Sequence, residues 1–433
     1  MICFPRHQRQ RDSGIPSWPS VEGATSSMRF IHSADWQLGA RFAQFGPKAE
    51  FLRAARLATL EKVLRKADEL SVDAVVIAGD LFEDNQVDDS VIVGALERFG
   101  LFPHLPVFVL PGNHDPASGP ASIWNRRPFC SKPTNVTVLD KPEVHGCAGA
   151  WFITSPLLQK VSTIDPSLRI AELARQITDD RIRIGITHGA LAIPARHQPN
   201  DFPIALDAAT RASLDYLAVG HWHTWQVYDN GKLTMPGTPE PDAFHQEGAG
   251  FVALVEIVKR GTPPEVRQIP VSTLSWRVID FDFAEGESAR QSLDRSLAEL
   301  RPSADNIVVQ IKLHGAVSPQ TLSETSEWLE SVLEPFAVCQ IVDQSVAAFS
   351  ALELEELRRE HPLLAQAVAD LAQIEHLATG TGLPSNVDQG QVISLASVQK
   401  ILANAQIELA VLDSDFFKVA QRLLIQALHE STQ

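Results

Sequence analysis

The chain has 433 residues, more than one hydrophobic core usually serves, so two or three domains are expected. Its 44% hydrophobic content is typical of a globular protein, and its four cysteines lack the spacing of a zinc site or a disulfide framework, which suits a reducing cytoplasm. The net charge of −16 argues against a broad basic surface that coats nucleic acid, although it does not exclude a nuclease that handles phosphate through metal ions.

The first 27 residues are polar and rich in serine, proline and arginine, without the apolar core of a secretion signal. We expect residues 1–27 to be a disordered leader or a mis-assigned start, with the folded chain beginning at Met28. No later apolar run approaches the ~18 residues that a membrane-spanning helix needs.

Strand-like and helix-like patterns alternate over residues 28–265. Short apolar runs predict strands at 29–34, 73–78, 107–110, 151–154, 182–187, 216–219 and 251–257. Helical periodicity occurs between the first three strands, at 50–70 and 88–99. Strands that alternate with helices predict an α/β fold with a largely parallel sheet.

Five short polar segments each follow one of these strands. They are Asp35-Trp36-Gln37, Gly79-Asp80, Gly112-Asn113-His114-Asp115, His188-Gly189 and Gly220-His221-Trp222-His223. In open α/β sheets, sites lie at the carboxyl ends of the strands. Each segment alone is compatible with a turn, a helix cap or a buried, hydrogen-bonded histidine. The five together predict a single site.

The residue types in these segments are those of a two-metal phosphoesterase site. Two divalent ions about 3.5–4 Å apart can activate a water and hold both oxygens of an in-line displacement. Asp80 suits the bridging position, Asp35 offers a carboxylate to one ion, and Asn113 offers an amide oxygen to the other. The nitrogen ligands are the imidazoles of His188, His221 and His223. This mixture of donors favours Mn²⁺, with Mg²⁺, Fe²⁺ and Zn²⁺ as alternatives.

Other residues of the same segments are candidates for catalysis and for substrate contact. His114 is next to a ligand and is expected to stabilise the phosphate or to protonate the leaving oxygen, while Asp115 fixes its tautomer. Trp36 and Trp222 either stack on a base of the substrate or pack locally and shape the ligand loops.

A second domain is expected after a boundary at residues 261–270, where proline and glycine are dense. Strands at 278–283, 307–313 and 338–342, with helices at 288–300 and 319–333, predict a small α/β domain over residues 272–348. Residues 349–433 are predicted to be helical, with a linker at 379–390. The apolar stripe from Phe416 to Ala427 either packs on its own chain or docks on a partner.

The five segments resemble those of the calcineurin-like metallophosphoesterase superfamily and, more narrowly, those of the SbcD-type DNA repair exonucleases. The narrower resemblance rests on MRFIHSADWQLG (28–39), AGDLFED (78–84), LPGNHD (110–115), ITHG (186–189), VGHWH (219–223) and MPGTPEPDAFHQEGAGFVALVEI (235–257). It implies a sandwich of two sheets flanked by helices over residues 28–265. It also implies a DNA-facing cap domain at 272–348 and a partner-binding helical region at 349–433.

The resemblance also implies an activity and its partners. Six side chains would bind manganese, namely Asp35, Asp80, Asn113, His188, His221 and His223. His114 would contact the phosphate. The implied reaction is cleavage of DNA phosphodiesters in DNA repair, by 3′-to-5′ exonuclease and single-strand endonuclease action. The implied partners are DNA and an SbcC-type coiled-coil ATPase, around a dimer of this chain.

Two positions depart from the family pattern. The family has histidine two residues after the first aspartate, where this chain has Gln37, whose amide oxygen is a weaker ligand for Mn²⁺ than imidazole. One metal site is therefore expected to be weaker. Glu83 stands where some relatives have a DNA-contacting histidine, so substrate contacts are expected to differ.

Two other functions fit the same segments. A phosphodiesterase or phosphatase for a small molecule would use the same metal pair, but it would need neither the domain at 272–348 nor the helical tail. A catalytically weak scaffold protein within an ATPase complex is compatible with Gln37 and with the acidic net charge.

Overall fold

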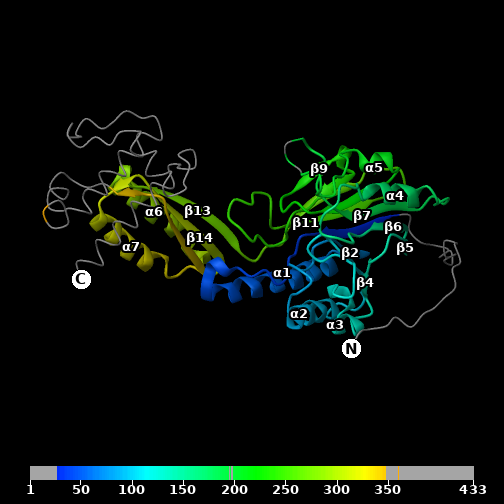
Figure 1. Cartoon of the computed structure of the whole chain (residues 1–433), viewed down its shortest axis with the longest axis horizontal. Helices are drawn as coiled ribbons and strands as arrows, with labels where there is room; N and C mark the ends of the chain where they lie inside the picture. The colour runs from blue at the N-terminus through cyan, green and yellow to red at the C-terminus, as the bar shows by residue number, and fades with distance from the viewer. Residues whose placement is uncertain (1–26, 195, 197, 348–358, 360–433) are drawn as a thin grey trace, which may run out of the picture. The chain divides into compact units, whose positions relative to one another are not determined.

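The computed structural model describes residues 27–194, 196, 198–347 and 359. Residues 1–26 and, apart from Arg359, the predicted helical region 349–433 with its linker and apolar stripe lie outside the described residues. The chain divides between Trp276 and Arg277 into two compact units, which are described separately (Figure 1). Within the described ranges, no helix has the length and apolarity needed to span a membrane.

Two six-stranded sheets form the first unit (Figure 1). The first sheet has the order β12-β11-β1-β2-β3-β4, with β1 Met28–Ser33, β2 Ala74–Ala78, β3 Val107–Leu110, β4 Val136–Val138, β11 Phe251–Ile257 and β12 Glu265–Pro270. The second has the order β5-β6-β7-β8-β10-β9, with β5 Val144–Cys147, β6 Ala150–Ser155, β7 Ile182–His188, β8 Tyr216–Gly220, β9 Gln226–Tyr228 and β10 Leu233–Met235. The central strands are almost wholly buried, as expected for apolar strands covered on both faces.

Strand direction brings the five polar segments that carry the predicted ligands, called the ligand segments below, to a common end of each sheet. Strands β1 to β4 are parallel to one another, and so are β6, β7, β8 and β10. In the first sheet Ser33 pairs with Ile77, and Ala78 pairs with Leu110. In the second sheet His188 pairs with Gly220. The chain therefore leaves neighbouring strands at the same level, directly before each ligand segment.

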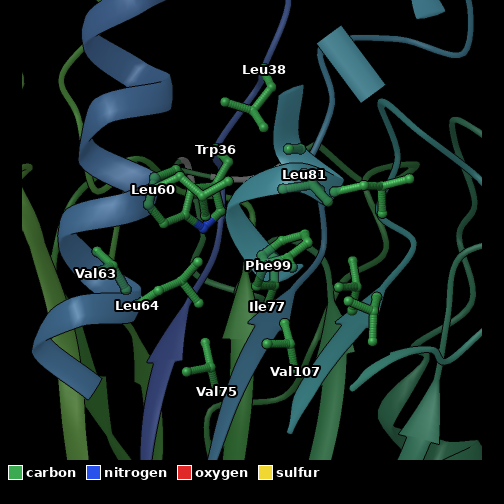
Figure 2. Close-up of a cluster of buried hydrophobic side chains, with 14 of the residues drawn as sticks. Trp36, Leu38, Leu60, Val63, Leu64, Val75, Ile77, Leu81, Phe99 and Val107 are labelled. Carbon is green, nitrogen blue, oxygen red and sulfur yellow. The ribbon is translucent and has the colours of Figure 1, made fainter. Parts of the chain in front are cut away.

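Helices cover the outer face of each sheet. The long helices α1 Ala49–Glu69 and α2 Asp89–Gly100 pack on the first sheet through an apolar core that includes Leu64 and Phe99 (Figure 2). The shorter α4 Ser167–Ala174 and α5 Ala208–Arg211 cover the second sheet. Further short elements are α3 Arg127–Cys130 and the 3₁₀ segments η1 Ala43–Lys48, η2 Ile123–Asn125 and η3 Asp229–Gly231.

Aromatic side chains fill the space between the two sheets. The ring of Phe152 on β6 lies 4.9 Å from that of Phe108 on β3 and 6.1 Å from that of Phe30 on β1, between centroids. A hydrogen bond of 2.9 Å between His32 Nδ1 and the Tyr216 hydroxyl also joins the sheets. Burial lowers the pKa of His32 to about 3, so this histidine is a neutral core residue. The predicted sandwich of two sheets flanked by helices is confirmed.

The second unit is a small α/β structure. Its three-stranded sheet has the order β13-β14-β16, with β13 Ser275–Asp282, β14 Ile307–His314 and β16 Val338–Asp343. The helices α6 Glu287–Leu300 and α7 Pro319–Leu333 pack on it through Leu297 and Leu329. The other elements are η4 Phe283–Glu285, η5 Arg301–Asn306, β15 Ala316–Val317 and β17 Val346–Ala347.

The expected boundary at residues 261–270 is corrected by the structure. Glu265–Pro270 is strand β12, which pairs antiparallel with β11 at the edge of the first sheet. Its outer face is exposed, so it carries polar residues and resembles a linker in the sequence. The short strands β4, β5, β9 and β10 were not predicted, because three or four residues are too few to establish a period of two.

We expect Phe152→Ala to lower the free energy of unfolding by about 3–5 kcal/mol, because the cavity would lie between two sheets that cannot collapse into it. Urea denaturation followed by circular dichroism measures the change. Phe51→Ala is the matched control, since Phe51 is 39% exposed on α1 and its truncation should cost about 1 kcal/mol or less. Equal losses for the two variants would contradict the place of Phe152 in the core.

Candidate metal centre

The loops that carry the predicted ligands are joined through their backbones. Asp35 N donates to the Gly79 carbonyl at 3.2 Å, and Gln37 N donates to the Asp80 carbonyl at 3.0 Å. The φ angles of Asp35, Gln37 and Asp80 are 56°, 41° and 54°, in the left-handed region that costs residues other than glycine roughly 1–3 kcal/mol. Residues with such strain cluster at functional sites, where the surrounding structure holds them in place.

Asp80, Asn113, His188 and His221 form one half of the centre. Asn113 Oδ1 lies 2.9 Å from His188 Nε2 and 3.0 Å from His221 Nδ1. His188 Nε2 also lies 3.3 Å from Asp80 Oδ2. Because His188 is fully buried and its Nδ1 donates to the Ala78 carbonyl at 2.8 Å, its ring is fixed with Nε2 facing the other three side chains.

The surroundings of His188 Nε2 fit a cation. Since Nδ1 carries the proton donated to the Ala78 carbonyl, a neutral ring turns a lone pair towards the oxygens of Asp80 and Asn113, which are themselves acceptors. Burial alone would lower the pKa of His188, but the charge of Asp80 outweighs burial and raises this pKa to about 9. The raised pKa means that a second proton, on Nε2, relieves the repulsion between this lone pair and the two oxygens. A divalent ion bound between these atoms would relieve the same repulsion.

Asp35, Gln37 and His223 form the other half. Both carboxylate oxygens of Asp35 accept hydrogen bonds from His221 N, at 2.9 and 3.0 Å. Gln37 Nε2 lies 3.0 Å from His223 Nε2. If the Gln37 amide were rotated by half a turn, its oxygen would take the place of Nε2 beside His223. The amide oxygen and the imidazole could then face the same ion.

The two halves meet in a compact, buried cluster. Donor atoms of Asp35, Asp80 and His188 all lie within 4.8 Å of one another. Burial alone would raise the pKa of Asp80, but the neighbouring His188 lowers it below the usual range, so Asp80 is charged. Two carboxylates this close together and out of water need positive charge nearby. Oxygen and imidazole donors in this arrangement fit divalent metal ions.

Glycines beside the ligands let the loops approach closely. A Cβ atom on Gly112 would lie 2.1 Å from Asp80 Oδ1, and one on Gly79 would lie 2.1 Å from His188 Nδ1. Gly79 also has a φ of +96°, which side-chain-bearing residues rarely adopt. Any larger residue at either position would displace Asp80 or His188, which explains why glycine precedes Asp80 and Asn113.

His114 lies half-buried at the rim of this cluster. Its backbone N donates to Asp80 Oδ1 at 2.9 Å, which fixes its position relative to the carboxylate. Its ring Nδ1 donates to the carbonyl of Glu83, also at 2.9 Å. This bond selects the tautomer in which Nε2 is the nitrogen with the lone pair.

The predicted contact of Asp115 with the His114 ring is corrected. The Asp115 carboxylate is buried and accepts hydrogen bonds from Phe82 N at 3.0 Å and Gly112 N at 2.7 Å. Burial and the nearby charge of Asp80 raise its pKa to about 7. Asp115 therefore joins two ligand loops, and the Glu83 carbonyl orients the His114 ring in its place.

Trp36 is not placed to contact a substrate, contrary to one of the predicted roles. It is fully buried in the core next to α1, and its Nε1 donates to Ser33 Oγ at 3.1 Å (Figure 2). Because Asp35 and Gln37 face the centre, the residue between them points to the opposite side. Trp222 is half-buried, with the Arg196 guanidinium 5.8 Å from its ring, and Glu83 is also half-buried.

Three charged residues that the sequence did not single out also reach the centre. Asp201 Oδ2 lies 2.8 Å from His221 Nε2, and Asp242 Oδ2 lies 3.4 Å from His223 Nδ1. Arg56, buried within α1, donates to the carbonyl of Trp36. No local pattern marks these residues, because Arg56 is one of many charged residues in the sequence of α1 and both aspartates lie in loops.

Comparisons with known proteins agree with this geometry. A family model described as calcineurin-like phosphoesterase matches residues 28–225, which include all five ligand segments. The chain is 35% identical over 388 residues to the DNA double-strand break repair protein Mre11 of Archaeoglobus fulgidus, covering 77% of this chain and 81% of that protein.

Two relatives from Bacillus subtilis are more distant in sequence. The chain is 23% identical over 338 residues to the uncharacterized metallophosphoesterase YhaO, covering 71% of this chain and 77% of the relative. It is 22% identical over 366 residues to one of the subunits of the nuclease SbcCD, covering 77% of this chain and 84% of the relative. All three alignments cover most of both proteins.

We expect Gln37→His to tighten the binding of one Mn²⁺ by about tenfold or more, because an imidazole nitrogen would replace a neutral amide oxygen. Calorimetric titration of the metal-free protein with MnCl₂ measures the change. Gln291→His, at an exposed position of α6, is the matched control and should leave the titration unchanged. If Gln37→His also has no effect, Gln37 is not a ligand.

Proposed function

Because the chain belongs to the calcineurin-like phosphoesterase family, we propose that it is a metal-dependent phosphodiesterase that cleaves DNA in double-strand-break repair. It acts as a 3′-to-5′ exonuclease and single-strand endonuclease, together with an SbcC-type coiled-coil ATPase and around a homodimer. In support, one well-covered relative is named a double-strand break repair protein and another belongs to a nuclease.

The observation that carries the proposal is the buried convergence of Asp35, Asp80 and His188 with the other ligand side chains. Asp80 belongs to the first half, but its carboxylate also lies close to that of Asp35 in the other half, so it suits the bridging position. Asn113, His188 and His221 would complete one ion site, and Asp35, Gln37 and His223 the other. Two bound divalent ions, proposed to be Mn²⁺, would polarise a phosphodiester and make a water acidic enough to attack it.

His114 is proposed as the catalytic residue. The Glu83 carbonyl holds its Nδ1 proton, so Nε2 is the atom that takes up a second proton and then contacts a phosphate oxygen or gives that proton to the leaving oxygen. Burial raises the pKa of the adjacent Glu83 carboxyl above its usual range. The hydrogen bond from His114 N to Asp80 Oδ1 holds His114 next to the proposed metal ligands.

The acidic net charge is consistent with a nuclease that binds DNA through its metal ions and a partner protein, and not through a basic surface of its own. A charge of −16 makes a broad electrostatic contact with the phosphate backbone unfavourable. We therefore propose that affinity for DNA comes from the metal ions, from the α/β unit at 272–348 acting as a cap, and from the ATPase. The region 349–433, outside the described residues except for Arg359, is proposed to bind that ATPase.

We expect the protein to degrade end-labelled linear duplex DNA in the presence of MnCl₂, and His114→Ala to lower the rate about 10²–10⁴-fold through loss of proton transfer. His104→Ala is the matched control, because His104 is exposed and its ring contacts the surface carboxylate of Asp68, away from the ligand segments. Its rate should equal that of the unmodified protein.

Bis-p-nitrophenyl phosphate, assayed in parallel, separates this proposal from the two alternative functions. Cleavage of that ester without any cleavage of DNA would identify a phosphodiesterase for small molecules. Metal-dependent cleavage of neither substrate would favour a scaffold. A DNA-cleavage rate unaffected by His114→Ala would contradict the catalytic role of His114.

A further inference from the structure

The two histidines of the Gly220–His223 segment are each held from outside by a carboxylate. His221 Nε2 lies 2.8 Å from Asp201 Oδ2, so its Nδ1 is turned towards Asn113. His223 has the opposite arrangement, because Asp242 Oδ2 lies 3.4 Å from its Nδ1 and its Nε2 faces Gln37. Such outer carboxylates fix the tautomer and the direction of a metal-binding imidazole.

Arg56 connects Asp242 to the loop that carries the first ligands. Its Nε and Nη2 both donate to the Trp36 carbonyl, at 2.9 and 2.6 Å, between Asp35 and Gln37 in sequence. Its Nη1 donates to the Glu240 carbonyl at 2.9 Å, and Nη2 lies 3.9 Å from Asp242 Oδ2. One guanidinium therefore sets the separation between the Asp35–Gln37 loop and the carboxylate that holds His223.

The burial of Arg56 indicates that these contacts are specific. The side chain is 1% exposed, and a buried cation is costly unless acceptors and opposite charge compensate it. Only the planar fork of arginine can donate to two carbonyls in different loops and still face a carboxylate. A lysine ammonium at the same position would reach fewer of these acceptors.

The segment that carries Asp242 is anchored a second time. The buried Glu240 carboxylate accepts hydrogen bonds from Thr273 N at 2.6 Å and Leu274 N at 3.1 Å, and also from the hydroxyl of Thr59 on α1. Gln246 Nε2 donates to the other oxygen of Asp242. Gln246 Oε1 also accepts a hydrogen bond from Asp242 N at 3.0 Å, so Gln246 holds both the backbone and the carboxylate of Asp242 beside His223.

We propose that Arg56 and Asp242 are positioning residues for the metal ion held by Asp35, Gln37, Asp80 and His223. The inference rests on the proposed metal centre and adds two residues outside the five ligand segments. Asp242 keeps the His223 proton on Nδ1, so the lone pair of Nε2 faces the ion. Arg56 keeps Asp242 and the Asp35–Gln37 loop at a fixed spacing. The contacts of Asp242 and Arg56 contribute more to metal affinity here because Gln37 is a weak ligand.

Calorimetric titration of the full chain with MnCl₂ tests this inference without any substrate. We expect Asp242→Asn and Arg56→Lys each to weaken one of two Mn²⁺-binding events about 10–100-fold and to leave the other unchanged. The matched controls are Asp180→Asn on the surface and Arg65→Lys on the exposed face of α1, neither of which should alter the titration. Circular dichroism establishes that each variant is folded.

The DNA-cleavage rate at saturating MnCl₂ separates positioning from catalysis. Positioning residues act through metal affinity, so kcat of Asp242→Asn should return to within about twofold of the unmodified protein once both sites are filled. A titration of Asp242→Asn identical to that of the unmodified protein would overturn the inference, even if Arg56→Lys fails to fold. If the unmodified protein binds no Mn²⁺, the proposed function itself fails.

Discussion

Asp35 and Asp80 lie close together with almost no exposure to solvent, and much of the first unit serves to make this arrangement stable. Two buried carboxylates repel each other and lose their hydration, so backbone N–H groups and His188 must compensate them, and the charge of the buried Arg56 acts on Asp35. Parallel strands bring the loops to the same level, and left-handed turns direct both carboxylates inward. A pair of divalent cations would complete the compensation.

Much of the fold and of the centre follows from the sequence, because strand-end ligands obey a simple geometric rule. Strands β1, β2, β3, β7 and β8 are apolar runs of four to seven residues, and each ends where a ligand segment begins. The rest depends on tertiary structure. Whether Trp36 faces the site or the core is set by the turn at Asp35, and the bond from His114 to the Glu83 carbonyl involves a backbone atom that no side-chain pattern reveals.

Contacts outside the ligand segments explain how the side chains of the centre stay in place although Gln37 is a weaker ligand than histidine. His223 is held by Asp242, Asp242 by Gln246, and the loop before Gln37 by Arg56. Contacts between such distant parts of the chain leave no local signal in one sequence. The same holds for the edge strand β12, whose exposed polar residues resemble a linker until its pairing with β11 is seen.

Anomalous X-ray diffraction at the manganese edge, from crystals of the full chain grown with MnCl₂, tests the central claim most directly. The account predicts two anomalous peaks, one bounded by Asp35, Asp80 and His223, and one bounded by Asp80, Asn113 and His188. Saturated crystals with no peak beside Asp80, or with ions bound only at other places on the protein, would contradict it.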